Sequence, residues 1–116
     1  MVKVKFAENS KTGMFSLKIN GHAGQAEIGK DIICASATIL AYTVAQIVTN
    51  MKSLGCLKKT PTVKMSKGDA VITCHPKEEY KNEVEQTYLV AQTGYELLAH
   101  NYPQYVELTK FGEAKA

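Results

Sequence analysis

The sequence predicts an α+β fold in two layers, with a mostly antiparallel sheet packed against two long helices. Two pairs of segments alternate between apolar and polar residues, which is the two-residue period of half-buried strands. Two longer segments carry apolar residues at three- and four-residue steps, which is the period of a helix. The segments follow one another as strand, strand, helix, strand, strand, helix (ββαββα), an order typical of α+β domains.

The length and composition indicate one globular domain covering residues 1–116. Hydrophobic residues make up 45% of the 116 positions and charged residues 22%, which is ordinary for a folded domain. The net charge of +3 comes from lysines spread along a chain without arginine. Direct nucleic-acid binding is not expected, because arginine is the side chain that best reads phosphate and guanine.

The first two strands are predicted at 2–6 and 14–20, joined by the turn sequence "ENSKTG". Strict alternation places one apolar set of each strand toward the core. These inward residues are Val2, Val4, Phe6, Phe15, Leu17 and Ile19. The pair therefore forms a hairpin with one buried face.

The first helix is predicted from about Ile32 to about Ser53, with Asp31 as its N-cap and Gly55 ending it. Residues 32–51 carry no charge, which approaches the length of a membrane span. Six polar residues within that stretch argue against a membrane and favour a buried helix. The helix carries apolar residues on all of its sides, but one sheet can cover only one side. The rest must be covered by the second helix, a partner subunit, or both.

The second half repeats the pattern. "TPTVKM" and "DAVITCH" form a hairpin across the turn 66–69, and a helix follows from Pro76 to about Asn101. The apolar stripe predicted for this helix is Tyr80, Val84, Tyr88, Ala91, Tyr95 and Leu98. A short strand is expected at 105–109, and the polar end from about 110 is expected to fray.

A histidine and a cysteine flank the segment that joins the second strand to the first helix. His22 follows Gly21 where the strand ends, and Cys34 falls in the first turn if Asp31 is the cap. A helix N-terminus favours an anion, and a neighbouring imidazolium favours a thiolate further. Such a pair can attack a peptide carbonyl, and first-turn amides can receive the resulting oxyanion. The alternative is a cysteine that is simply a buried small apolar residue.

The other cysteines and histidines have structural interpretations. Cys56 is expected to be an incidental thiol in a connector, Cys74 a core residue, and the adjacent His75 a side chain on the opposite face. His100 complements the helix dipole in the last turn of the second helix. No C-x-x-C or H-x-x-x-H spacing occurs, so no zinc site is expected.

The chain is expected to be cytoplasmic. Three cysteines cannot all pair and do not resemble a disulfide framework, and "MVKVKFAENS" lacks the apolar region of a secretory signal. In a reducing compartment, a thiol stays free to react.

The motif "INGHAG", followed by "GKDIICASAT" at the start of a helix, resembles the ribosomal-processing cysteine protease family of bacteria. The resemblance extends from the N-terminal strand pair to the closing "YPQYV". It implies an endopeptidase that removes a short N-terminal extension from a large-subunit ribosomal protein, cutting after two aromatic residues. It also implies a homodimer that uses no metal or organic cofactor.

The resemblance assigns roles to particular residues. Cys34 would be the nucleophile and His22 the base, Asp31 matches the family's aspartate, and Gly21 matches its hinge glycine. Thr38 stands where the family usually has serine, so a fine contact with substrate differs.

We further expect loop 23–30, with Gly24 and Gly29, to close over the substrate as a lid. Two other classes of function remain open. One is a non-catalytic ribosome-assembly factor, and the other is a redox switch in which Cys34 is oxidised.

Overall fold

The computed structural model of the chain describes residues 1–21, 30–66 and 68–113, and the side chains of Lys30 and Asp31 are outside that description. Its strands are β1 (Val2–Asn9), β2 (Met14–Asn20), β3 (Thr62–Ser66), β4 (Asp69–Cys74) and β5 (Val106–Thr109). Its helices are α1 (Lys30–Ser53), the short 3-10 helix η1 (Glu78–Tyr80) and α2 (Lys81–Asn101).

The five strands form one sheet in the order β3-β4-β2-β1-β5. Three of the four neighbouring pairs are antiparallel, and β5 runs parallel to β1. The prediction of a mostly antiparallel sheet is therefore confirmed. β5 is the strand at 105–109 that the sequence indicated, and it forms one edge of the sheet.

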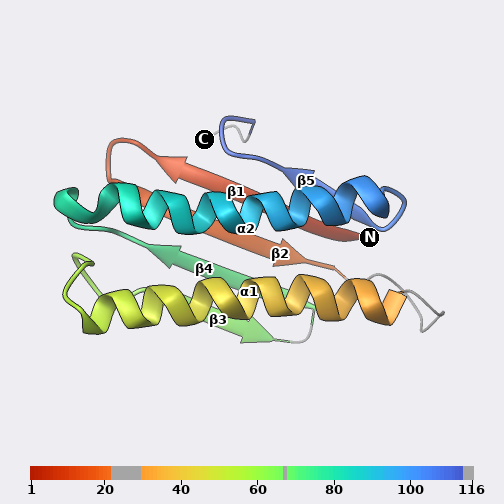
Figure 1. The fold of residues 1–116 in the computed structure, drawn as a ribbon, viewed down its shortest axis with the longest axis horizontal. Helices are drawn as coiled ribbons and strands as arrows, with labels where there is room; N and C mark the ends of the chain where they lie inside the picture. Colours follow the sequence, from red (N-terminus) through yellow and green to blue (C-terminus); the bar gives the residue numbers. More distant parts are fainter. Residues whose placement is uncertain (22–29, 67, 114–116) are drawn as a thin grey trace.

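Both helices lie on the same face of the sheet (Figure 1). α1 contacts β4 and α2, while α2 contacts β2 and β5. This arrangement confirms the predicted two-layer α+β architecture. The opposite face of the sheet carries no helix among the described residues.

The core fills the space between the sheet and the helices. The apolar sets predicted for β1 and β2 are all buried, as are Val84, Tyr88, Ala91 and Tyr95 of α2. Phe6 packs edge-on against Tyr95 with ring centroids 5.8 Å apart, and Phe15 lies 5.7 Å from Tyr88. Apolar burial of this kind is the main stabilising contribution to a domain of this size.

The C-terminal segment contributes to the core as far as Phe111. The Phe111 ring contacts Phe6, Phe15 and Tyr88. The Phe111 amide donates a 2.9 Å hydrogen bond to the side-chain oxygen of Gln92. One aromatic ring within this polar sequence therefore packs between the sheet and α2, and the fraying expected from about residue 110 stays a prediction.

The second helix begins later than predicted. Pro76 forms an isolated bridge with Leu57, η1 follows, and the regular α-helix starts at Lys81. Tyr80 consequently lies at the boundary between the two helical forms and is 37% exposed, so its place in the buried stripe was wrong. The remaining five members of the stripe are buried or half-buried.

α1 is long and apolar enough, by length and composition, to cross a membrane between Ile32 and Ser53. Its inward positions, among them Ile33, Ala37 and Val44, are buried in the core. Packing on β4 and α2 is what the sequence predicts for a core helix of a globular domain. Ile39 and Tyr42 on its other side remain exposed, so α2 covers only part of its circumference.

Candidate active site at the start of the first helix

The end of β2 and the start of α1 lie at the same end of the molecule, beside the start of β1 (Figure 1). β2 runs toward this end in the middle of the sheet, and α1 begins here and runs back above β3 and β4. The fold thus brings Gly21, the last residue described before the gap, to the same end as the first turns of α1. This is the juxtaposition that the sequence predicted for the two halves of the motif.

Gly21 occupies a position that only glycine can take. Its φ is +94°, in the left-handed region that other residues rarely adopt. A Cβ at Gly21 would also overlap the backbone carbonyl oxygen of Met1. The close approach of these two backbone segments turns the chain out of β2 immediately before His22.

Cys34 is the fifth residue of α1, one turn from its start. Its thiol is free and its side chain is half-exposed, lying against the core at the edge of the cluster. The neighbouring Ile33 is fully buried and Ile32 is exposed, so the first turns present Cys34 at the boundary between core and surface. A thiol at such a boundary is held in place by packing yet remains accessible.

The prediction that Asp31 is the N-cap of α1 was wrong. The helix begins at Lys30, so Asp31 has helical backbone angles, whereas a cap residue does not. The prediction failed because it relied on apolar periodicity, which begins only at Ile32. Lys30 is helical but polar, so it does not contribute to that periodicity. Asp31 therefore lies in the first turn, near the positive end of the helix dipole.

A hydrogen bond from α2 fixes α1 one turn beyond Cys34. The buried Tyr95 hydroxyl donates to the main-chain carbonyl of Ala37 over 2.7 Å. The sequence indicated only packing for Tyr95, because an acceptor on the main chain 58 residues away leaves no pattern in the sequence. Burial raises the pKa of the Tyr95 hydroxyl well above its ordinary value, so it stays protonated as a donor.

Thr38 lies on the same side of α1 as Cys34, since residues four apart are neighbours on a helix surface. Its side chain is exposed. Ser36, by contrast, donates its hydroxyl hydrogen to the carbonyl of Ile32 at 2.7 Å, within the helix. Thr38 is thus placed beside the thiol, on the accessible surface.

Several predicted site residues fall outside the described residues. These are His22, Gly24 and Gly29, together with the rest of the lid expected at 23–30 except Lys30, which is the first residue of α1. The pairing of Cys34 with His22 therefore stays a prediction.

Cys56, Cys74 and His75 lie at or beyond the far ends of α1 and β4, whereas His100, exposed in the last turn of α2, lies at the same end of the molecule as the start of α1 (Figure 1). Cys74 is fully buried, as predicted, and accepts a weak hydrogen bond from the Tyr88 hydroxyl at 3.6 Å. Burial raises the pKa of the Cys74 thiol, and the hydrogen bond from Tyr88 opposes that shift. Partial burial, helped by Lys59 and Lys58, lowers the pKa of His75. Among the described residues, no three His, Cys, Asp or Glu side chains gather in a metal-binding group.

Three solved structures share this fold over nearly the whole chain. The protein SMU.848 of Streptococcus mutans is 23% identical, with a TM-score of 0.68 over 94% of this chain and 92% of that one. The ribosomal processing protease Prp of Staphylococcus aureus, in complex with a substrate peptide, is 16% identical, with a TM-score of 0.67 over 96% and 99%. The same protease with a covalently linked product peptide is 17% identical, with a TM-score of 0.66 over 96% and 99%.

The family comparison covers most of the chain, although no curated protein matches it. The model of the family described as cysteine protease Prp matches residues 1–107. That range includes the strand pair, the end of β2, Cys34, both helices and the start of β5. The chain therefore belongs to the cysteine protease Prp family.

Proposed function

We propose that this protein is a cytoplasmic endopeptidase that removes the N-terminal extension of a large-subunit ribosomal protein, with Cys34 as nucleophile and His22 as base. The observation that carries the proposal is a free, half-exposed thiol in the early turns of α1, at the end of the molecule where β2 stops just before His22. Family membership supports cysteine-protease chemistry. The Staphylococcus aureus structures with substrate and product peptides support a peptide substrate from a ribosomal protein.

The proposed reaction proceeds through a thioester. Cys34 Sγ, having given its proton to His22, attacks the scissile carbonyl carbon, so that an S–C bond forms and the C–N bond then breaks. His22 passes the proton to the leaving amine. Water that loses a proton to His22 attacks the thioester, and the C–S bond breaks to release the new carboxylate and restore the thiol.

The start of α1 supplies the groups that would stabilise the oxyanion. The amides of residues 30–32 have no carbonyl partner within the helix, because each helical N–H bonds to the carbonyl four residues earlier and those carbonyls precede the helix. Amides aimed at the developing negative charge are the usual form of such stabilisation. Gly21 would act as the hinge before His22, Asp31 as an organiser of the helix start, and Thr38 as a contact for the substrate.

Cleavage of a substrate peptide by matched cysteine variants tests this function. The peptide spans the extension and its junction in the precursor ribosomal protein, with the aromatic pair before the cut. Cys34→Ser and His22→Ala are each expected to lower kcat/KM by about 1000-fold or more, with the fold kept by circular dichroism. Cys56→Ser, which changes another half-exposed free thiol, is expected to stay within about twofold of the parent.

The alternatives give different results in the same experiment. A non-catalytic assembly factor would cleave the peptide in no form. A redox switch would show peroxide-dependent oxidation of Cys34 without peptide turnover. Full activity of Cys34→Ser would refute the proposed nucleophile.

We also propose that the protein forms a homodimer through the outer surface of its helix layer. Only 33% of the most apolar window of α1 is buried in the single chain. Ile39 and Tyr42 of α1 are 62% and 53% exposed, and Val90 and Leu97 of α2 are 72% and 60% exposed. We call these four residues the helix face. They form an exposed apolar surface of the kind that protein interfaces cover.

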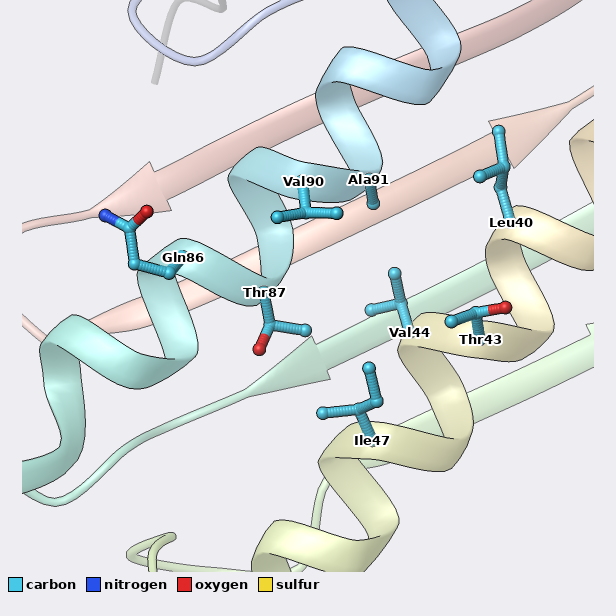
Figure 2. Close-up of a pocket in the computed structure, with 8 residues that line it drawn as sticks. All are labelled: Leu40, Thr43, Val44, Ile47, Gln86, Thr87, Val90 and Ala91. Carbon is cyan, nitrogen blue, oxygen red and sulfur yellow. The ribbon is translucent and has the colours of Figure 1, made fainter.

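A groove between the two helices gives this surface a shape that a second copy can fill. It has a volume of about 280 Å³ and contains no charged residue. Figure 2 shows Val44 and Ile47 of α1 opposite Thr87 and Val90 of α2. The full lining is Leu40, Thr43, Val44, Ile47, Gln86, Thr87, Val90 and Ala91.

The whole outer surface of the helix layer, of which the helix face is the apolar part, is large enough for a stable dimer. A helix of 24 residues such as α1 is about 36 Å long. Two helices packed side by side present a face about 20 Å wide. The resulting area of about 700 Å² is close to the roughly 800 Å² that each partner buries in an interface of standard size.

Changing one large residue of the helix face tests the dimer. The parent is expected to have twice the 12.7 kDa mass of one chain, measured by light scattering. Tyr42→Glu is expected to weaken association about 100-fold, because a charge would be buried without a partner. Leu54→Glu, at an exposed apolar residue just beyond α1, is the control and should leave the mass unchanged. A parent of single-chain mass at micromolar concentration would contradict the proposal.

A further inference from the structure

Among the described residues, the outer face of the sheet, opposite the helices, carries four of the chain's fourteen lysines, brought together from strands as far apart in the sequence as β1 and β3. Strand alternation points Lys3 and Lys5 of β1, Lys18 of β2 and Lys64 of β3 to this face, and all four are exposed. Glu107 and Asp69 are the acidic residues that the described strands place on the same face. The sheet leaves this face open, since both helices lie on the other side (Figure 1).

The strand register places three of these lysines in one row. Lys5 lies directly opposite Lys18, Lys18 is opposite Val71, and Val71 is opposite Lys64. With neighbouring strands about 4.8 Å apart, this lysine row (Lys5, Lys18 and Lys64) spans about 14 Å across the sheet. Neither of the two ion pairs between described residues, Lys81–Glu8 and Lys110–Glu113, involves the row.

The lysine row is unfavourable for the isolated domain. Lys5 and Lys18 lie directly opposite each other on neighbouring strands, and like charges so placed destabilise a sheet. Opposite charges at the same positions would stabilise it instead. A row of this kind is therefore best explained by an anionic partner that supplies the missing charge.

We propose that the lysine row binds the phosphate backbone of RNA. The row beside it carries accessible hydroxyl groups from Thr73 and Thr62, and hydroxyls join lysines in contacting phosphate oxygens. The Thr73 hydroxyl already lies 3.3 Å from that of Ser16. The face is broad and open, which suits recognition of a duplex by backbone and shape rather than by base edges.

The chemistry of the face disfavours the other anionic partners. A protein interface needs buried apolar or aromatic anchors, and stable anchoring to a membrane needs inserted apolar residues or a lipid chain in addition to basic residues. Val71 is the one large apolar side chain that the described strands direct to the lysine row, and it is partly buried. The choice of RNA over DNA rests on the proposed function, which places the substrate among ribosomal proteins.

This inference revises the expectation that the chain has no direct contact with nucleic acid. That expectation rested on the absence of arginine and on the spread of lysines along the chain. Strand pairing gathers lysines that are up to 59 positions apart, from Lys5 to Lys64, on one surface. Lysines acting as point charges suffice for sequence-independent contact with phosphates.

Binding of a fluorescent 20-base-pair RNA duplex tests the proposal, measured by anisotropy from about 50 to 200 mM salt. The test variant is Lys5→Gln/Lys18→Gln/Lys64→Gln. The control is Lys58→Gln/Lys59→Gln/Lys77→Gln, which removes the same charge from exposed residues outside the sheet face. The test variant is expected to lose affinity at least about 10-fold and to reduce the salt slope by about 2, while the control stays within about threefold.

Peptide cleavage by both variants is measured in parallel and is expected to match the parent, so that a failure of RNA binding is distinct from a failure of the protease function. Equal losses of affinity in the two variants would show a mere effect of net charge and overturn the proposal. So would the absence of parent binding at about 50 mM salt. Equal affinity for a DNA duplex, or equally strong competition by polyglutamate, would overturn the assignment to RNA.

Discussion

Gly21→Ala is expected to destabilise the domain by about 2–4 kcal/mol and to reduce peptide cleavage strongly even at temperatures where the variant stays folded. A left-handed backbone costs a residue with a Cβ about 1–2 kcal/mol. At Gly21 the new Cβ would also overlap the Met1 carbonyl, and a backbone atom cannot move aside as a flexible side chain can. Relief of that overlap must shift the end of β2, and with it the point from which His22 departs.

Gly13→Ala is the matched control for this prediction. Gly13 also has a positive φ, +75°, but no atom lies within 4 Å of where its Cβ would be. Its cost should therefore be the backbone strain alone, about 1 kcal/mol, without loss of cleavage. Urea unfolding and kcat/KM of both variants give the comparison. Equal destabilisation by the two substitutions would show that the approach to Met1 contributes nothing.

Stability is expected to fall steeply above about pH 10, because two tyrosine hydroxyls are buried. Tyr88 donates to the carbonyl of Ile72 at 3.1 Å, and Tyr95 donates to that of Ala37 at 2.7 Å. Burial is the largest cause that raises the pKa of both hydroxyls, with the Cys74 thiol adding to the shift at Tyr88. An acid whose pKa is raised by folding stabilises the folded state below its unfolded pKa, and this contribution is lost as the pH rises above that value.

The size of the alkaline effect follows from proton linkage. Above about pH 10 each tyrosine removes about 1.4 kcal/mol of stability per pH unit, so the pair removes about 4 kcal/mol by pH 11.5. That is a large part of the 5–15 kcal/mol typical of a domain. Urea unfolding between pH 8 and 11.5 measures it.

Single and double substitutions separate the two tyrosine contributions. Tyr95→Phe is expected to cost about 1 kcal/mol at pH 8 through the lost hydrogen bond and to lower the alkaline slope by about 1.4 kcal/mol per pH unit. Tyr88→Phe should remove a similar tyrosine contribution, and the slope that remains in the double variant should be that of the buried Cys74 thiol, whose pKa is also raised by burial. An unchanged slope in the double variant would refute the assignment.

The apolar periodicity of each segment was enough to predict the strands and long helices of this fold, but not which strands lie next to one another in the sheet. Alternation at Val2, Val4 and Phe6 fixes which face of β1 is buried, since a strand with one apolar face has one way to bury it. The order of strands depends on pairing between distant segments, for which a single sequence carries no local signal. The position of Phe111 against the core was missed for the same reason.

At the site, the sequence predicted the two elements that meet but not the contacts that hold them. Gly21 was named as a hinge only through the family resemblance, and its positive φ was not predicted. The helix start was misplaced at Asp31, since caps depend on backbone angles rather than on apolar spacing. The support that Tyr95 gives to α1 was missed because its acceptor is a main-chain carbonyl.

The parallel pairing of β1 with β5 has a consequence for biosynthesis. Val2 lies opposite Val106, so β1 gains its second neighbour only after the segment that separates these two residues has been synthesised. Until then β1 is a sheet edge whose free backbone groups can capture strands of other chains. Maturation of the whole sheet is therefore a late event, and chaperones acting at the ribosome exit would be expected to shield the nascent protein through that interval.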